Sequence, residues 1–154
     1  MTQLVEKRLM LNCGAAVLLV DEDLEYLEFM RGTIQRGGYS VSACDSYTEG
    51  IRQLESGVYD MVVVGQGSRN FEGRCVLECA TAFDRHLPVV VVARSVEMGC
   101  YLEAMQLGAV DYISPGLSGS EITRALQTHA LQRKLRPGCV KVERATAISA
   151  GLGA

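Results

Sequence analysis

The chain has 154 residues, of which 48% are hydrophobic and 21% charged, and its formal net charge is -3. This length and composition are typical of one globular domain. The mild negative charge gives no reason to expect nucleic acid or an anionic membrane as the main partner. No apolar run approaches the roughly 20 residues that a membrane helix needs, and the N-terminus does not resemble a signal peptide. We therefore expect a cytoplasmic protein without a membrane partner.

Six cysteines are spread along the chain: Cys13, Cys44, Cys75, Cys79, Cys100 and Cys139. They form no CxxC pair, and nothing in the sequence indicates an exported, disulfide-bonded domain. Cys75 and Cys79 stand four residues apart and could share a helix face as two metal ligands would, but the two histidines show no matching pattern. We expect reduced, half-buried cysteines that pack as small hydrophobic residues.

Strand-like and helix-like segments alternate five times along the chain. Gly37 and Gly38 stop the first helix, and Asp45 or Ser46 can cap the second. In chain order, the predicted elements are a strand over Ala16–Val20, a helix from Leu24 to Gly37, a strand over Tyr39–Cys44, a helix over Tyr47–Ser56, a strand over Asp60–Val64, a helix over Arg74–Asp84, a strand over Pro88–Ala93, a helix over Glu97–Leu107, a strand over Asp111–Ser114 and a helix from Ser118 or Ser120 to Leu135.

Nearly continuous apolar strands between amphipathic helices predict a parallel sheet that is covered on both faces. Right-handed crossovers then give an α/β fold with a doubly wound five-stranded sheet, whose ligand site lies at the carboxyl ends of the strands. We expect one folded domain over residues 14–135. Residues 1–13 are expected to be an N-terminal extension, and residues 136–154 a disordered tail or a linker.

Five segments, taken in this order, resemble bacterial response-regulator receiver domains: VLLVDEDLEYLEFM, GYSVSACDSYTEGIRQL, YDMVVVGQGSRNFEG, LPVVVVAR and EAMQLGAVDYI. The resemblance covers about residues 14–134, and the stretch from Gly108 to Tyr112 is its most specific part. It implies the flavodoxin-like receiver fold, with five parallel strands and five helices, and a function in two-component or phosphorelay signal transduction.

The resemblance also implies where a phosphorylation site would lie. In receivers, an acidic pair after the first strand holds Mg²⁺, and an aspartate after the third strand accepts the phosphoryl group of a kinase phosphohistidine. A hydroxyl residue after the fourth strand and a lysine after the fifth bind the phosphoryl oxygens. In this chain the acidic pair is Asp21 and Glu22, whereas the aspartate position is Gly65.

The two remaining positions also depart from the receiver pattern. The hydroxyl position is Ala93, and the lysine position is Pro115, or Ser114 if the alignment has a one-residue gap. Two carboxylates alone bind Mg²⁺ weakly at best, because this ion keeps its water shell without further ligands. The alternative for Asp21 and Glu22 is a solvated acidic corner at the start of a helix. We expect no catalytic residue and no cofactor.

The resemblance therefore implies a degenerate receiver that acts by protein–protein contact without phosphorylation. The expected contact face for a protein partner or a homodimer covers Met98–Gln106, Tyr112 and Glu121–Gln132. Tyr112 matches the aromatic switch of receivers and is expected to point inward, because Ala93 leaves room for it. The competing interpretation of Tyr112 is an edge-strand tyrosine without a role.

Three other functions are weighed against this one. A small-ligand sensor would use the vacated pocket at Gly65, Ala93 and Ser114. An enzyme would need a nucleophile paired with a base, and the sequence offers no such pair. The basic stretch Arg124–Arg144 could touch nucleic acid, but such charge is more often a solvated helix face.

Overall fold

The computed structural model describes residues 15–135, with side chains described as far as residue 131. The expected extension at 1–13, the expected tail at 136–154, and with them Cys13 and Cys139, lie outside the described residues. The strands are β1 (Ala16–Val20), β2 (Ser40–Cys44), β3 (Met61–Gly65), β4 (Val89–Val92) and β5 (Asp111–Ile113). The helices are α2 (Leu24–Arg36), α3 (Tyr47–Ser56), α4 (Arg74–Phe83), α5 (Met98–Gln106) and α6 (Gly119–Leu135).

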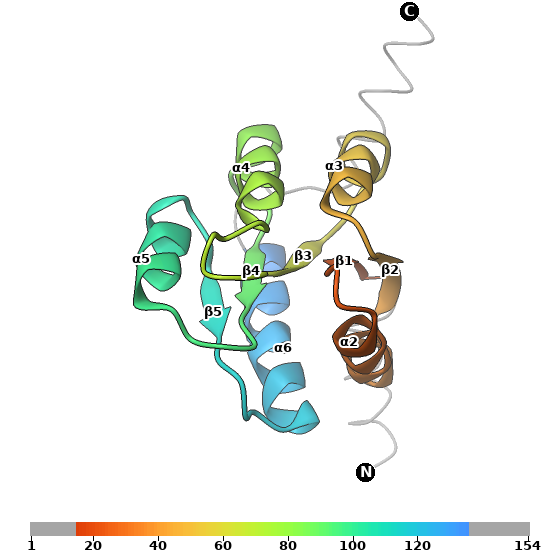
Figure 1. The fold of residues 1–154 in the computed structure, drawn as a ribbon. Helices are drawn as coiled ribbons and strands as arrows, with labels where there is room; N and C mark the ends of the chain where they lie inside the picture. Colours follow the sequence, from red (N-terminus) through yellow and green to blue (C-terminus); the bar gives the residue numbers. More distant parts are fainter. Residues whose placement is uncertain (1–14, 136–154) are drawn as a thin grey trace, which may run out of the picture.

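The five strands form one parallel sheet with the order β2-β1-β3-β4-β5. Helices α2 and α6 cover one face of this sheet, and α3, α4 and α5 cover the other (Figure 1). The predicted doubly wound fold is confirmed. Within the described part of the chain, no helix is both long enough and apolar enough to cross a membrane.

The sheet separates two apolar cores, and alternate residues of the central strands supply both. In β1, Leu18 and Val20 pack into the core under α3, α4 and α5, whereas Val17 and Leu19 pack into the core under α2 and α6. Every residue of β3 and β4 is buried. Branched residues on both sides of these strands explain why the segments are apolar throughout, as a sheet covered on both faces requires.

Several residues that the helical spacing predicts to be buried are exposed. Leu24 is 61% exposed because it is the first residue of α2, and the buried stripe of this helix begins one turn later at Leu27. Phe83 is 46% exposed at the last residue of α4, beside the buried stripe rather than on it. The expectation of half-buried cysteines is wrong for Cys75 and Cys79, which flank the same stripe and face solvent.

The other two described cysteines, Cys44 and Cys100, are buried, and all four are free thiols. Within residues 15–131, three or more His, Cys, Asp or Glu side chains nowhere come together in a way that could hold a metal ion. Cys75 and Cys79, the exposed pair in α4, therefore have no further metal ligands around them in the described structure.

Two helical glycines provide a matched test of the packing between α3 and the sheet. A β-carbon on Gly50 of α3 would lie 2.7 Å from Cγ2 of the fully buried Val20, whereas a β-carbon on Gly99 of α5 would meet nothing within 4 Å. We predict that Gly50→Ala lowers the free energy of unfolding by about 1–3 kcal/mol, despite the better helix propensity of alanine. Gly99→Ala should leave this energy unchanged or raise it by up to about 1 kcal/mol.

Urea unfolding of both variants measures the two values. Equal stabilities for Gly50→Ala and Gly99→Ala would contradict the close contact between α3 and β1.

Candidate functional site at the carboxyl edge of the sheet

The parallel strands bring most of the predicted site residues to one edge of the sheet. Asp21 follows β1, Gly65 is the last residue of β3, and Ala93 follows β4, where its N–H donates to the carbonyl of Ile113 at 2.9 Å. Asp21 and Ala93 are buried. Ser114, the residue after β5, is half-buried. Pro115 is exposed beyond β5.

The carboxylate of Asp21 occupies the space beside Gly65. A β-carbon on Gly65 would lie 2.5 Å from Oδ2 of Asp21 and 2.6 Å from its Cγ. Asp21 is only 4% exposed, and its Oδ1 accepts a hydrogen bond from the N–H of Asp23 at 3.0 Å. Burial raises the pKa of Asp21, although the Asp23 N–H and the charge of Arg94 act in the opposite direction. Side chains larger than glycine at position 65 would therefore require Asp21 to move.

The backbone around Gly65 is also held from other elements. The buried hydroxyl of Tyr47 in α3 donates to the carbonyl oxygen of Gly65 at 3.0 Å. Gly73, which precedes α4, lies so close that a β-carbon on it would collide with this same oxygen. Burial raises the pKa of Tyr47, so its hydroxyl is a stable hydrogen-bond donor near neutral pH.

Asp23 and Arg94 join the loops after β1 and β4, and neither was among the predicted site residues. Asp23 caps α2, since its Oδ1 accepts the N–H of Tyr26 at 2.9 Å, and its Oδ2 forms an ion pair with Nη1 of Arg94. The Tyr26 N–H and, to a smaller extent, Arg94 lower the pKa of Asp23. The third acid of this corner, Glu22, is exposed.

This donor set does not fit a resident Mg²⁺ ion. One carboxylate, Asp21, is buried against Gly65, and Asp23 already caps a helix and pairs with Arg94. Mg²⁺ needs near-octahedral oxygen ligands and is usually held by carboxylates together with phosphate oxygens. Of the three acids, Glu22 alone is exposed. Asp21 and Asp23 could serve as Mg²⁺ ligands only if they gave up their contacts with Gly65, the Tyr26 N–H and Arg94.

Gln66, the residue after β3, has a side chain that is almost fully buried at 1% exposure. Its Oε1 accepts a hydrogen bond from the hydroxyl of Tyr112, and its Nε2 makes longer contacts with the carbonyl oxygens of Ser95 at 3.4 Å and Ser68 at 3.5 Å. A buried amide needs such partners, because burial without hydrogen bonds is costly. Gln66 thus connects the loops after β3 and β4 to β5.

Tyr112 is partly buried, and its hydroxyl points toward the buried side chain of Gln66 rather than into solvent. That Ala93 makes room for it stays a prediction. Besides its bond to Gln66, the hydroxyl of Tyr112 accepts the N–H of Glu97, the residue before α5, at 3.3 Å. Its ring packs edge to face on Tyr101 of α5, with centroids 5.4 Å apart. The role of Tyr112 as a switch stays a prediction. The signal that sequence reasoning missed is a polar residue, Gln66, directly after a fully apolar strand.

Comparison with known proteins agrees with this architecture. The family model described as "Response regulator receiver domain" matches residues 17–127. The chain belongs to this family. Its receiver fold is shared with a receiver domain from Methanospirillum hungatei, at 18% identity and a TM-score of 0.71 over 77% of this chain and 94% of that one. A receiver domain from Clostridium thermocellum gives 20% identity and a TM-score of 0.72, covering 79% and 98% of the two chains.

Curated relatives include the transcriptional regulatory protein ZraR of Escherichia coli, which is 22% identical over 72% of this chain and 25% of ZraR. The C4-dicarboxylate transport transcriptional regulatory protein DctD of Rhizobium meliloti is 24% identical over 81% of this chain and 27% of DctD. The Arabidopsis thaliana two-component response regulator ARR11 is 26% identical over 80% of this chain and 24% of ARR11. The chain is thus homologous to the receiver domains of two-component response regulators, and it spans about a quarter of these relatives.

The hydrogen bond between Gln66 and Tyr112 can be measured in a double-mutant cycle. We predict that Gln66→Met and Tyr112→Phe each lower the free energy of unfolding by about 0.5–2 kcal/mol, because each removes one partner of a buried bond. The loss in free energy of unfolding of the double variant should be smaller than the sum of the two single losses by about 0.5 kcal/mol or more. Denaturant unfolding of the four proteins gives this coupling energy.

Tyr59→Phe is the matched control, because the hydroxyl of Tyr59 donates to Gln53 and not to Gln66. When Tyr59→Phe is combined with Gln66→Met, the loss in free energy of unfolding should equal the sum of the two single losses within about 0.5 kcal/mol. Additive losses for Gln66→Met and Tyr112→Phe would contradict the bond described here.

Proposed function

We propose that this receiver domain transmits its signal by protein–protein contact without being phosphorylated. The observation that carries the proposal is the contact between Asp21 and Gly65. The position that aligns with the phosphoryl acceptor of receivers has no side chain, and a buried carboxylate fills the space beside it. An anion that approached this position would meet the negative charge of Asp21 rather than a lysine or a hydroxyl residue.

The other aligned positions support the same function. Ala93 has no hydroxyl for a phosphoryl oxygen, and neither Pro115 nor Ser114 has a cationic side chain. Arg94 supplies positive charge near the acidic corner, but its guanidinium group is paired with Asp23. Mg²⁺ binds weakly at best in this proposal, since no phosphoryl group adds ligands to Asp21 and Glu22.

The contacts of Tyr112 then keep the contact face in one conformation. In this proposal Gln66 holds the Tyr112 hydroxyl inward, and Tyr112 in turn contacts Glu97 and Tyr101 at the first turn of α5. A two-state equilibrium can be shifted only by a ligand that binds the two states differently. Without phosphorylation, the partner therefore meets a constitutive surface.

The proposed surface is the outer side of α5, and its occupant is a second copy of the chain. Large apolar side chains are exposed at five positions within ten residues: Val96, Met98, Tyr101, Leu102 and Met105. Exposed apolar patches of this kind mark protein interaction sites. Such a patch can pair with its own copy about a two-fold axis, and a specific interface needs about 800 Å² from each partner. If the chain does not associate with itself, the same surface would instead bind a different protein.

The absence of phosphorylation is tested by intact-mass measurement. We predict that incubation with acetyl phosphate and Mg²⁺ adds no phosphoryl group to this chain, because Gly65 offers no nucleophile. A receiver that retains the acceptor aspartate, treated in parallel, should gain one phosphoryl group and shows that the reagent is active. A phosphoryl group on any residue at the carboxyl edge of the sheet would overturn the proposal.

The contact surface is tested with one exposed leucine. We predict that the chain self-associates with increasing concentration in analytical ultracentrifugation, and that Leu102→Asp weakens this association by about tenfold or more, because a charge would be buried in the interface. Phe83→Asp is the control, since Phe83 is comparably exposed but lies on α4. A chain that stays monomeric at high concentration, or equal effects of both substitutions, would contradict the proposed homodimer.

A further inference from the structure

Two methionines lie among the exposed apolar residues of α5, the helix beside the edge strand β5 (Figure 1). Met98 is 64% exposed and Met105 is 39% exposed. The other two methionines within residues 15–131, Met30 and Met61, are buried in the core under α2 and α6. Oxidants convert the methionine thioether to a polar sulfoxide, and they reach exposed side chains first. Both accessible methionines of the described chain therefore belong to the surface proposed for self-association.

Met98 and Met105 occupy the two ends of one stripe on α5. Tyr101 and Leu102 follow Met98 by three and four residues, so they lie on the same outer side of the helix, whereas the buried Cys100 faces the core. Met105 lies a further turn along this side, about 10 Å from Met98 at 1.5 Å per residue. The stripe thus has an aromatic and an aliphatic residue in its middle and a thioether at each end.

Two-fold symmetry determines what these thioethers meet in a homodimer. A two-fold axis pairs the same surface of both copies. If the two α5 helices are antiparallel, Met98 faces the partner's Met105, and if they are parallel, each methionine faces the same methionine of the partner. In both arrangements the ends of the contact consist of methionine side chains from both copies. Oxidation of the two sites would therefore place polar sulfoxides at both ends.

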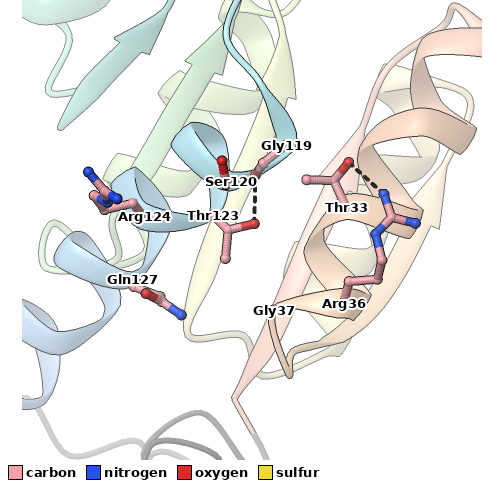
Figure 2. A pocket seen from close by; sticks show the side chains of 8 residues that line it. All are labelled: Thr33, Arg36, Gly37, Gly119, Ser120, Thr123, Arg124 and Gln127. Atoms are coloured by element: carbon pink, nitrogen blue, oxygen red, sulfur yellow. Dashed lines mark hydrogen bonds between the residues drawn. The ribbon is translucent and has the colours of Figure 1, made fainter.

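The other exposed sulfur atoms of the described chain lie outside this stripe. They belong to Cys75 and Cys79 of α4, since Cys44 and Cys100 are buried. On the other face of the sheet, a cavity of about 490 Å³ between α2 and α6 is lined by eight residues, none of which is a methionine or a cysteine (Figure 2). Within residues 15–131, accessible sulfur is thus confined to α4 and α5, and only the thioethers of α5 lie in the proposed contact.

We propose that oxidation of Met98 and Met105 to methionine sulfoxide by hydrogen peroxide prevents α5 from pairing with a second copy of the chain. This inference rests on the proposed self-association and adds its regulation. The thioether sulfur attacks one peroxide oxygen, so that an S–O bond forms and the O–O bond breaks. The sulfur is oxidised by two electrons, and the peroxide is reduced to water.

The oxidised surface associates less well because a sulfoxide oxygen accepts hydrogen bonds from water. An apolar contact offers this oxygen no donor, and burying an unpaired polar group opposes association. The reaction takes place on the separated chain, in which Met98 and Met105 are exposed. Methionine sulfoxide reductases reverse the modification, one enzyme for each sulfoxide epimer, so the contact can be restored.

Analytical ultracentrifugation of the full chain before and after treatment with hydrogen peroxide tests the proposal. A thiol reductant is added afterwards to reverse disulfide and sulfenic acid formation at the cysteines. We expect peptide mapping to show oxidation of Met98 and Met105 well before Met30 and Met61. The dissociation constant of self-association should rise by about tenfold or more, and treatment with both sulfoxide reductases should restore it.

The double substitution M98L and M105L separates the two methionines from every other sulfur of the chain. Leucine keeps a similar volume, so this variant should self-associate within about threefold of the unmodified chain and should not respond to peroxide. The double substitution C75S and C79S is the matched control, because it removes the exposed thiols of α4 and leaves both thioethers of α5 in place. This control should remain sensitive to peroxide.

The outcomes distinguish this regulation from the proposed contact itself. A chain that is monomeric before oxidation would overturn the self-association and this inference with it. Three results would overturn the regulation alone: earlier oxidation of Met30 and Met61, an unchanged dissociation constant after Met98 and Met105 are oxidised, or an equal response to peroxide in the M98L and M105L variant.

Discussion

The arrangement of the loops at the carboxyl edge of the sheet depends on the hydrogen bonds of one buried side chain, that of Gln66. An amide at 1% exposure must find partners inside the protein, and here the partners belong to three different segments. They are the Tyr112 hydroxyl in β5, the Ser95 carbonyl after β4 and the Ser68 carbonyl after β3. Moving any of these segments away would leave a buried polar group unsatisfied, at a cost of about 1–3 kcal/mol. These contacts of Gln66 therefore tie the loops after β3 and β4 to β5.

The charges of this edge are balanced within the chain in a similar way. Arg94 pairs with Asp23 across the loops that follow β4 and β1, and Asp23 also caps α2. Asp21 is buried beside Gly65 and keeps one backbone hydrogen bond. Asp21, which the resemblance assigns to the metal-binding pair, thus fills the space beside Gly65, while Asp23 and Arg94 supply a helix cap and an ion pair.

The elements and their order could be predicted from the sequence, because strand and helix periodicities are local. The five strands and five helices agree with the predicted ranges to within a residue or two. The exposed ends of two helices, at Leu24 and Phe83, were not predicted, because spacing alone does not show where a stripe leaves the core. The partners of Gln66 and Arg94 could not be predicted either. Tyr112 is 46 residues from Gln66, and Asp23 is 71 residues from Arg94.

These contacts also determine what an acidic side chain at position 65 would require of its neighbours. An aspartate at position 65 would place its β-carbon 2.5 Å from Oδ2 of Asp21, which is itself buried. Two adjacent carboxylates repel, and one of them would have to take up a proton or move. If Asp21 turned away, it would lose the hydrogen bond from the Asp23 N–H. A side chain at position 65 is therefore coupled, through Asp21 and the Asp23 N–H, to the loop that begins α2.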